Sequence, residues 1–376
     1  MISWTSTRSC KLPEKLCYMQ SGLSPIRIDS ARLQRAAAVA EEAVRQGPYP
    51  SAVLAAASAD RLLLKHAVAK PGLPPAREDA IFLLASITKP IVATALMRLV
   101  EEGRLLLSDP VARHIPEFAA AGKERVTVYQ ILTHTSGLSE EEWERERAGP
   151  RRAAVAELVQ MACRAALRFE PGSQYEYCSF SFYVLAELIA RLGGMPYPEY
   201  LRRFIFRPLG MRDTSFAPEG DGRVRAMPVY NVGEPDFGPR LAYYTSVAFP
   251  GGGLWSTAAD LLAFGQTFLR GGRFADYHLL SPAAIEMMTG LHTAGMTEIA
   301  DGLPAPARYG LGWGKPGPNL LASPRAYRHG GATGTLLLVD PEWDLVFVFL
   351  TNQWGIAGTA PEQAANAVYG ALRRER

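Results

Sequence analysis

The chain is poor in cysteine, in long apolar runs and in net charge, and each shortage excludes a class of protein. Four cysteines in 376 residues are too few for a disulfide scaffold and match no common zinc spacing, so we expect free thiols in a reducing compartment. The longest apolar runs, such as residues 345–350, are far too short to span a bilayer. A net charge of +3 without a dense basic stripe argues against a nucleic-acid partner. We therefore expect a cytoplasmic protein with no membrane or nucleic-acid partner, and the sequence leaves its oligomeric state open.

Common catalytic and cofactor signatures are missing as well. There is no G-x-S-x-G nucleophile elbow and no G-x-x-x-x-G-K-[ST] phosphate loop. The six histidines are scattered and form no H-E-x-x-H pair, so we expect no metal site. The stretch GWGKPG (residues 312–317) matches G-x-G-x-x-G by letter, but Pro316 interrupts it and no helical pattern follows. We expect no cofactor.

Hydrophobic periodicity predicts strands near both ends of the chain and helices between them. Residues 29–47 have apolar residues at helical spacing, and residues 51–58 and 61–69 look like two paired strands. Residues 332–353 predict two further strands around a turn at 340–342, followed by a closing helix over 361–376. The first 28 residues are polar and without periodicity, so we expect a poorly structured tail, with either Met1 or Met19 as the start of translation. These patterns favour one sheet built from both ends of the chain.

A single lysine stands inside the apolar stretch IFLLASITKPIVATALMRLV (residues 81–100). Proline fits only the first turn of a helix, so a helix that contains Pro90 without a kink must begin between Ser86 and Thr88. Ser86 then lies at the positive end of the helix dipole, and Lys89 lies one turn further on the same face. A lysine kept out of water has a lowered pKa and can help to remove the proton of a neighbouring serine hydroxyl.

The alternative, non-catalytic interpretation of this stretch is a serine that caps the helix and a lysine whose amine reaches solvent. The chain contains only seven lysines against 33 arginines. Where arginine is the usual cation, a lysine in an apolar setting indicates a need for a group that can lose its proton.

Two later stretches complete a series with this S-x-x-K motif. In FEPGSQYEYCSFSFYVLAELI (residues 169–189), Tyr177 is followed two residues later by Ser179. In YRHGGATG (residues 327–334), His329 precedes Gly330 and Gly331. The series S-x-x-K, then Tyr-x-Asn, then Lys/His-Thr/Gly-Gly resembles the serine penicillin-recognising enzymes.

The resemblance is to the class C β-lactamase-like group of these enzymes, which includes family VIII carboxylesterases and D-amino-acid-directed peptidases. It covers residues 32–372, and LTHTSGL, RPLGMRDTSF, GGGLWSTAADLLAF and YGLGWG also look like framework segments of the group. It implies an α+β fold of the β-lactamase/transpeptidase type: an antiparallel sheet flanked by helices, plus a mostly helical lobe, with the active site between them. Beyond the tail, residues 29–376 would form a single catalytic unit, with an α/β lobe (29–85 and 250–376) and a helical lobe (86–249).

The resemblance also implies roles for these residues. Ser86 would be the nucleophile that forms an acyl-enzyme, and Lys89 and Tyr177 would handle its proton, with either of the two as general base. The backbone N–H groups of Ser86 and Ala332 would form the oxyanion hole, and glycines at 330 and 331 suit a close approach of substrate to the strand edge. Trp255 and Trp313 are candidates for the acyl pocket, although each is at least as well explained by packing.

Two positions depart from the β-lactamase pattern. His329 stands where β-lactamases have lysine, so the permanent cation for a substrate carboxylate is lost. Ser179 stands where asparagine is common, so the pocket lacks an amide. Both changes favour neutral esters, and we expect a serine carboxylesterase for short-chain acyl esters with weak or no β-lactamase activity. The alternatives are a D-aminopeptidase or DD-peptidase-like amidase, a β-lactamase, and a non-catalytic binding protein on the same fold.

Overall fold

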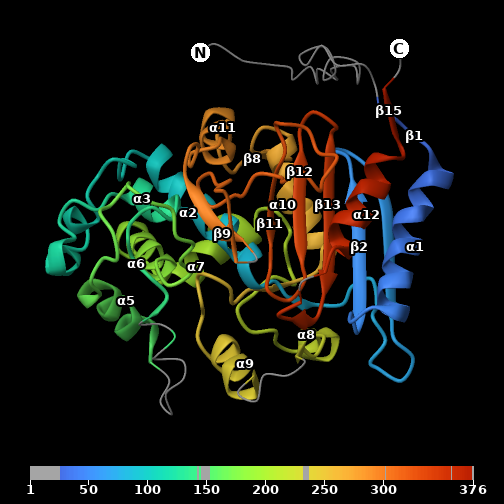
Figure 1. The fold of residues 1–376 in the computed structure, drawn as a ribbon, viewed down its shortest axis with the longest axis horizontal. Helices are drawn as coiled ribbons and strands as arrows, with labels where there is room; N and C mark the ends of the chain where they lie inside the picture. The colour runs from blue at the N-terminus through green and yellow to red at the C-terminus, as the bar shows by residue number, and fades with distance from the viewer. Residues whose placement is uncertain are drawn as a thin grey trace, which may run out of the picture.

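A five-stranded antiparallel sheet forms the centre of one half of the molecule (Figure 1). The computed structural model describes residues 26–141, 144, 153–231, 237–300, 302–356 and 358–374. The strand order is β11 (Tyr327–Gly330), β12 (Leu336–Asp340), β13 (Leu345–Thr351), β2 (Ser51–Ala57) and β3 (Leu62–Ala69). The N-terminal hairpin β2–β3 therefore joins the C-terminal strands through the β13–β2 pair. This arrangement confirms the predicted sheet built from both ends of the chain and the α+β class.

Helices cover both faces of this sheet. Strands β2, β12 and β13 are buried on both faces, which explains why they are apolar at every position except a few ends. Helices α1 (Ser30–Gln46) and α12 (Ala360–Tyr369) pack on the face that carries Leu54 and Phe347. Helix α10 (Ala258–Leu269) packs on the opposite face, against Val53 and Val346 (Figure 1).

The predicted N-terminal tail, which was expected to end at residue 28, ends earlier in the structure. Residues 26–28 were expected in the tail, but they form β1 (Ile26–Ile28), which pairs with β15 (Leu372–Arg374). Ile26 and Ile28 pack against the core beneath α1 and α12, which is why this short strand forms. The closing helix is correspondingly shorter than predicted, since α12 ends at Tyr369. The rest of the predicted tail lies outside the described residues.

The other half of the molecule is mostly helical. Helix α2 (Thr88–Glu101) runs from the edge of the sheet into this half and packs against α6 (Phe182–Gly193) (Figure 1). The helices around them are α3 (Val128–Leu132), α5 (Val155–Arg164), α7 (Tyr197–Leu201) and the π-helical turn η6 (Arg202–Phe206). Eleven of the 14 residues of α2 are buried, so the helix needs apolar residues on nearly every side.

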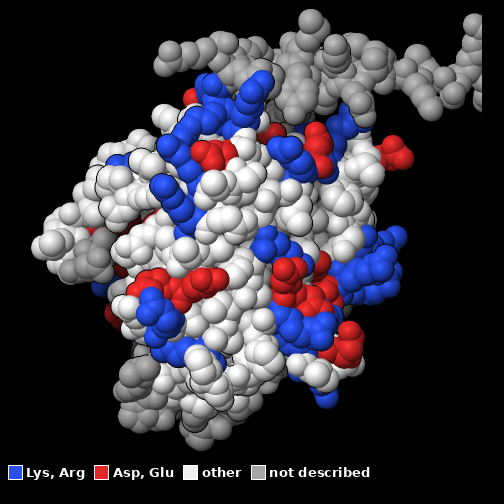
Figure 2. Space-filling view, turned by 90° about the vertical axis from the view of Figure 1, so that its right-hand side faces the viewer, with Lys and Arg blue, Asp and Glu red and all other residues white. Residues whose placement is uncertain are grey.

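Short elements make up the rest of the described fold. The helical ones are η3 (Ala85–Ile87), η4 (Val111–Arg113), η5 (Pro116–Gly122), α8 (Asp221–Arg225), α9 (Phe237–Ser246) and α11 (Pro282–Thr289). The strands are β4 (Phe82–Leu83), β5 (Tyr230–Asn231), β6 (Trp255–Ser256), β7 (Arg273–Phe274), β8 (Tyr277–His278), β9 (Thr297–Ala300), β10 (Leu303–Pro306) and β14 (Gln353–Trp354). Among the described residues, no helix combines the length and apolar character needed to cross a bilayer. On the α1 side of the molecule, Figure 2 shows basic residues in several groups, each with acidic residues beside it.

Gly265 lets α10 approach the sheet closely, and its replacement should destabilise the fold. A Cβ at this position would lie 2.5 Å from Cγ1 and 3.0 Å from Cγ2 of Val346 on β13. We expect Gly265→Ala to lower the free energy of unfolding by about 1–3 kcal/mol, as overpacked cores do. Gly238 in α9 is the matched control, because a Cβ there meets nothing within 4 Å. Thermal unfolding of both variants checks this: the prediction is wrong if Gly265→Ala melts as high as Gly238→Ala.

Candidate active site

Ser86 lies on a short turn that links the sheet region to α2. The preceding residues form β4, which pairs with β6, and the N–H of Leu84 donates to the carbonyl of Leu254 at 2.8 Å. Ser86 is the middle residue of η3, and α2 begins at Thr88, so the helix starts where Pro90 predicted. Ala85 adopts a positive φ of 48°, a strained conformation for a residue with a side chain. This turn leaves the Ser86 side chain partly exposed although its neighbours are buried.

Lys89 is completely buried one turn after Ser86. Its Nζ donates to Ser86 Oγ at 3.1 Å, to Ser179 Oγ at 2.9 Å and to the Gly251 carbonyl at 2.7 Å. All three donor positions of the amine therefore have an acceptor. Burial lowers the pKa of Lys89 to about 7, against the opposing influence of Glu140 and Cys178.

Tyr177 completes the cluster. The Lys89 amine lies 4.6 Å from the centre of the Tyr177 ring. Burial raises the pKa of Tyr177 well above its ordinary value, while hydrogen bonding to Ser86 and Ser179 acts in the opposite direction. The structure thus brings Ser86, Lys89 and Tyr177 together from η3, α2 and the segment before α6. Cys178, the neighbour of Tyr177, is a buried thiol whose pKa burial raises, so it is not an activated nucleophile.

His329 is buried at the end of β11 and makes two hydrogen bonds. Its Nδ1 donates to the Gly330 carbonyl at 2.8 Å, so its Nε2 is the acceptor for the Tyr309 hydroxyl at 2.9 Å. Burial, and then the nearby Lys89, lower the pKa of His329 to about 3. The imidazole is therefore neutral at physiological pH.

The segment that follows β11 packs against the turn that carries Ser86, through Gly331, Thr333 and Thr335. A Cβ at residue 331 would lie 2.2 Å from the Leu84 carbonyl oxygen, so only glycine fits. Thr333 Oγ1 donates to the Leu83 carbonyl at 2.8 Å, and Thr335 Oγ1 donates to the Leu84 carbonyl at 3.0 Å. The sequence attributed this glycine to an approaching substrate, but the close approach is to the protein's own backbone.

Two other predicted positions on this loop differ from Gly331. Gly330 has no such restriction, because the nearest atom to a Cβ there is the far end of the Arg328 side chain at 3.4 Å. Ala332 is exposed, and its carbonyl accepts from the Gly355 N–H at 2.8 Å. The backbone at Ala332 is therefore anchored to the segment that follows β14.

The two candidate tryptophans occupy packing positions. Trp313 is fully buried, stacked on Phe264 and in edge contact with Phe268 and Tyr327, so it does not line an open pocket. The proposal of Trp313 for the acyl pocket is therefore wrong. Trp255 is 7% exposed on β6 and packs with a small cluster around Leu83, outside the main core.

Three residues near Lys89 were not singled out from the sequence. Glu140 accepts a hydrogen bond from the Ser179 N–H, and His134 Nδ1 accepts one from the Cys178 N–H at 3.1 Å. The His134 ring lies 4.5 Å from the Tyr177 ring, and Gly251 supplies the carbonyl for Lys89. His134 stands inside the LTHTSGL segment, which carried a signal, whereas nothing in the sequence distinguished Glu140 from the glutamates that follow it.

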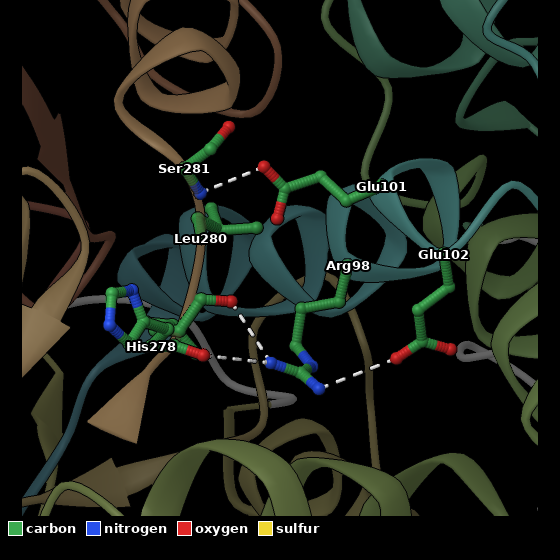
Figure 3. Close-up of a pocket in the computed structure, with 7 residues that line it drawn as sticks. Arg98, Glu101, Glu102, His278, Leu280 and Ser281 are labelled. Atoms are coloured by element: carbon green, nitrogen blue, oxygen red, sulfur yellow. Dashed lines mark hydrogen bonds and ion pairs between the residues drawn. The ribbon is translucent and has the colours of Figure 1, made fainter. Parts of the chain in front are cut away.

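A hollow elsewhere on the surface is separate from this cluster. It has a volume of about 310 Å³ and lies beside the C-terminal end of α2, where Arg98 donates to the carbonyls of His278 and Leu279 and pairs with Glu102 (Figure 3). None of Ser86, Lys89 and Tyr177 lines it. In the part of the chain that the structure describes, no group of three or more His, Cys, Asp and Glu side chains is arranged to hold a metal ion.

Three curated proteins illustrate what the chain is similar to in sequence. The chain is 31% identical to Protein Rv1367c of Mycobacterium tuberculosis over 320 residues, which are 73% of this chain and 78% of that protein. It is 36% identical to Esterase EstB of Burkholderia gladioli over 230 residues, 56% of this chain and 57% of EstB. It is 27% identical to a putative D-alanyl-D-alanine carboxypeptidase of Escherichia coli over 320 residues, 74% of this chain and 70% of the other.

Solved structures show the same fold. A penicillin-binding protein homologue from Caulobacter crescentus superposes with a TM-score of 0.77 at 23% identity, covering 93% of this chain and 100% of that one. A family VIII carboxylesterase superposes with a TM-score of 0.75 at 21% identity and the same coverage. The Beta-lactamase family model matches residues 36–371. Since this match spans nearly the whole chain, the protein belongs to the Beta-lactamase family of serine hydrolases.

Proposed function

We propose that this protein is a carboxylesterase that cleaves short-chain acyl esters through an acyl-enzyme on Ser86. The observation that carries the proposal is the 3.1 Å hydrogen bond between Ser86 Oγ and the buried amine of Lys89. A fully buried lysine destabilises a fold, because its charged form is kept out of water. With a pKa near 7, however, it can both accept and return a proton at neutral pH, which a reaction needs. A non-catalytic binding protein has no need of such a group.

The first step is the attack of Ser86 Oγ on the ester carbonyl carbon. As the new C–O bond forms, the hydroxyl proton passes to Lys89 Nζ and the carbonyl oxygen becomes an oxyanion. The N–H of Ser86, in the first turn before α2, and the N–H of Ala332 are the donors that we assign to this oxyanion. When the oxyanion collapses, the C–O bond to the alcohol breaks and the alkoxide takes its proton from Lys89 through the Tyr177 hydroxyl. Water then repeats the sequence on the acyl-enzyme and releases the acid.

Lys89 suits the role of general base better than Tyr177. The phenol of Tyr177 has a pKa well above 10, so it is neutral at pH 7. The amine of Lys89, with a pKa of about 7, is largely unprotonated just above neutrality. We therefore assign proton abstraction to Lys89 and proton relay to Tyr177.

The neutral state of His329 supports ester substrates over β-lactams. A β-lactam antibiotic carries a carboxylate, and His329 offers it no positive charge because its pKa is about 3. Its Nε2 is already engaged by the Tyr309 hydroxyl, so the ring is held as part of the wall of the site. The 36% identity to an esterase points the same way. The second candidate is a peptidase or amidase for D-residue substrates, which the relative named as a carboxypeptidase favours.

Ester hydrolysis should depend on Ser86 and should exceed β-lactam hydrolysis. We expect the wild type to hydrolyse p-nitrophenyl acetate and butyrate, and Ser86→Ala to lower kcat by at least about a thousandfold, as loss of a nucleophile does. Nitrocefin, penicillin and D-alanyl amides, assayed at the same enzyme concentration, test the alternatives. Ser136→Ala is a matched control, since Ser136 is buried and its hydroxyl bonds only locally, to the N–H of Leu138. Comparable turnover of penicillin and a short ester by the wild type would contradict the assignment.

The activity should rise with pH through the pKa of Lys89. Since the unprotonated amine is the base, kcat/KM for a neutral ester should increase about tenfold per pH unit below about pH 7 and level off above it. His329 does not contribute to this rise, because it is already neutral throughout the range. The release of p-nitrophenol is followed at its isosbestic wavelength. A rate that falls as pH increases through 7 would instead require protonated Lys89 and would assign the base to Tyr177.

A further inference from the structure

We propose that Glu140 is a positioning residue that acts on Lys89 through Ser179, so that Glu140, Ser179, Lys89 and Ser86 form one hydrogen-bonded chain. Neither the family resemblance nor the relatives assign a role to this glutamate. The catalytic consequence of the proposal rests on the proposed function, but the chain of contacts itself does not.

The contacts define the direction of each hydrogen bond. Lys89 Nζ donates to Ser179 Oγ at 2.9 Å, and in its neutral form the lone pair is left for Ser86, so the Ser179 hydroxyl keeps its own hydrogen for another partner. Glu140 accepts a hydrogen bond from the backbone N–H of Ser179, and the Ser179 hydroxyl also lowers the pKa of this carboxyl, which places the hydroxyl beside it. The carboxylate therefore accepts from Ser179, and Ser179 in turn accepts from the amine that contacts Ser86.

The surroundings of Lys89 make Glu140 the group that most favours its protonated form. The titratable groups that face the amine come from four segments: His134 after α3, Glu140 in the following loop, Tyr177 and Cys178 before α6, and His329 on β11. Burial keeps both histidines unprotonated and both the phenol and the thiol protonated. Of these groups, Glu140 has the largest influence in favour of the protonated Lys89 amine.

The arrangement also gives a reason for serine at position 179. In the motif that this stretch resembles, asparagine is common at this position. A serine side chain is shorter and its hydroxyl both accepts and donates, so it suits a site where a carboxylate stands behind it. The buried position of Glu140, whose pKa burial raises, is stabilised by Ser179 and by the charge of Lys89.

The direct test follows the titration of Lys89 without any substrate. Lysine labelled with ¹³C at Cε gives few signals because the chain has seven lysines, and the signal missing from Lys89→Arg assigns position 89. We expect the Lys89 signal to titrate near pH 7 in the wild type and about one pH unit lower in Glu140→Gln, because the opposite charge of a nearby carboxylate favours the protonated amine. Glu141→Gln is the control: Glu141 is exposed and lies near Arg168, and this variant should titrate as the wild type does.

Kinetics supply the second readout. The limb of the pH profile of kcat/KM that reports Lys89 should move to lower pH in Glu140→Gln, whichever protonation state of Lys89 is active. A lower kcat with an unmoved profile would indicate a merely structural role. Equal titration of Lys89 in Glu140→Gln and wild type overturns the proposal. A wild type without ester hydrolysis overturns the proposed function instead, since the titration decides the role of Glu140 on its own.

Discussion

The site depends on the burial of one amine. Lys89 has no contact with solvent, and its Nζ is held by the hydroxyls of Ser86 and Ser179 and by the carbonyl of Gly251. Desolvation destabilises the ammonium form relative to the neutral amine, and this lowers the pKa of Lys89 to about 7. The same lysine on the surface would stay protonated and could not serve as a base for Ser86. The apolar surroundings of α2 are therefore part of the chemistry as well as of the core.

The fold supplies this environment from segments far apart in the sequence. The turn before α2 carries Ser86 in a strained backbone, with Ala85 at a φ of 48°. Thr333 and Thr335 hold that turn by donating to the carbonyls of Leu83 and Leu84. Since both threonines belong to the stretch that follows β11, the position of Ser86 depends on the C-terminal strands of the sheet. Strain at Ala85, next to the reactive serine, is tolerated only where the surroundings determine the backbone so fully.

Much of the fold and part of the site could be predicted from the sequence, because the sequence patterns that indicate them are local. Proline at position 90 fixed the start of α2, and continuous apolar runs marked β2 and β13. The grouping of Ser86, Lys89 and Tyr177 came from a resemblance in motif order, and the structure brings these side chains together. Contacts between distant segments were not predictable. Glu140 resembles the glutamates after it, and its importance arises only when the loop folds beside Ser179. Trp313 was a candidate for the acyl pocket that packing explained at least as well, and its stacking on Phe264 places it in the core. Residues 26–28 lacked periodicity because a three-residue strand is too short to show any.

The central claim is that the unprotonated amine of Lys89 makes the Ser86 hydroxyl reactive, and covalent labelling tests it most directly. Wild type and Lys89→Met, which keeps the length and apolar stem of the side chain, are treated with a fluorophosphonate, and the modified peptide is located by mass spectrometry. The account predicts a single adduct on Ser86 in the wild type and a rate at least about a hundredfold lower in the folded Lys89→Met variant. Labelling of Ser86 at equal rates in the two proteins, or an adduct on a different residue, would contradict it.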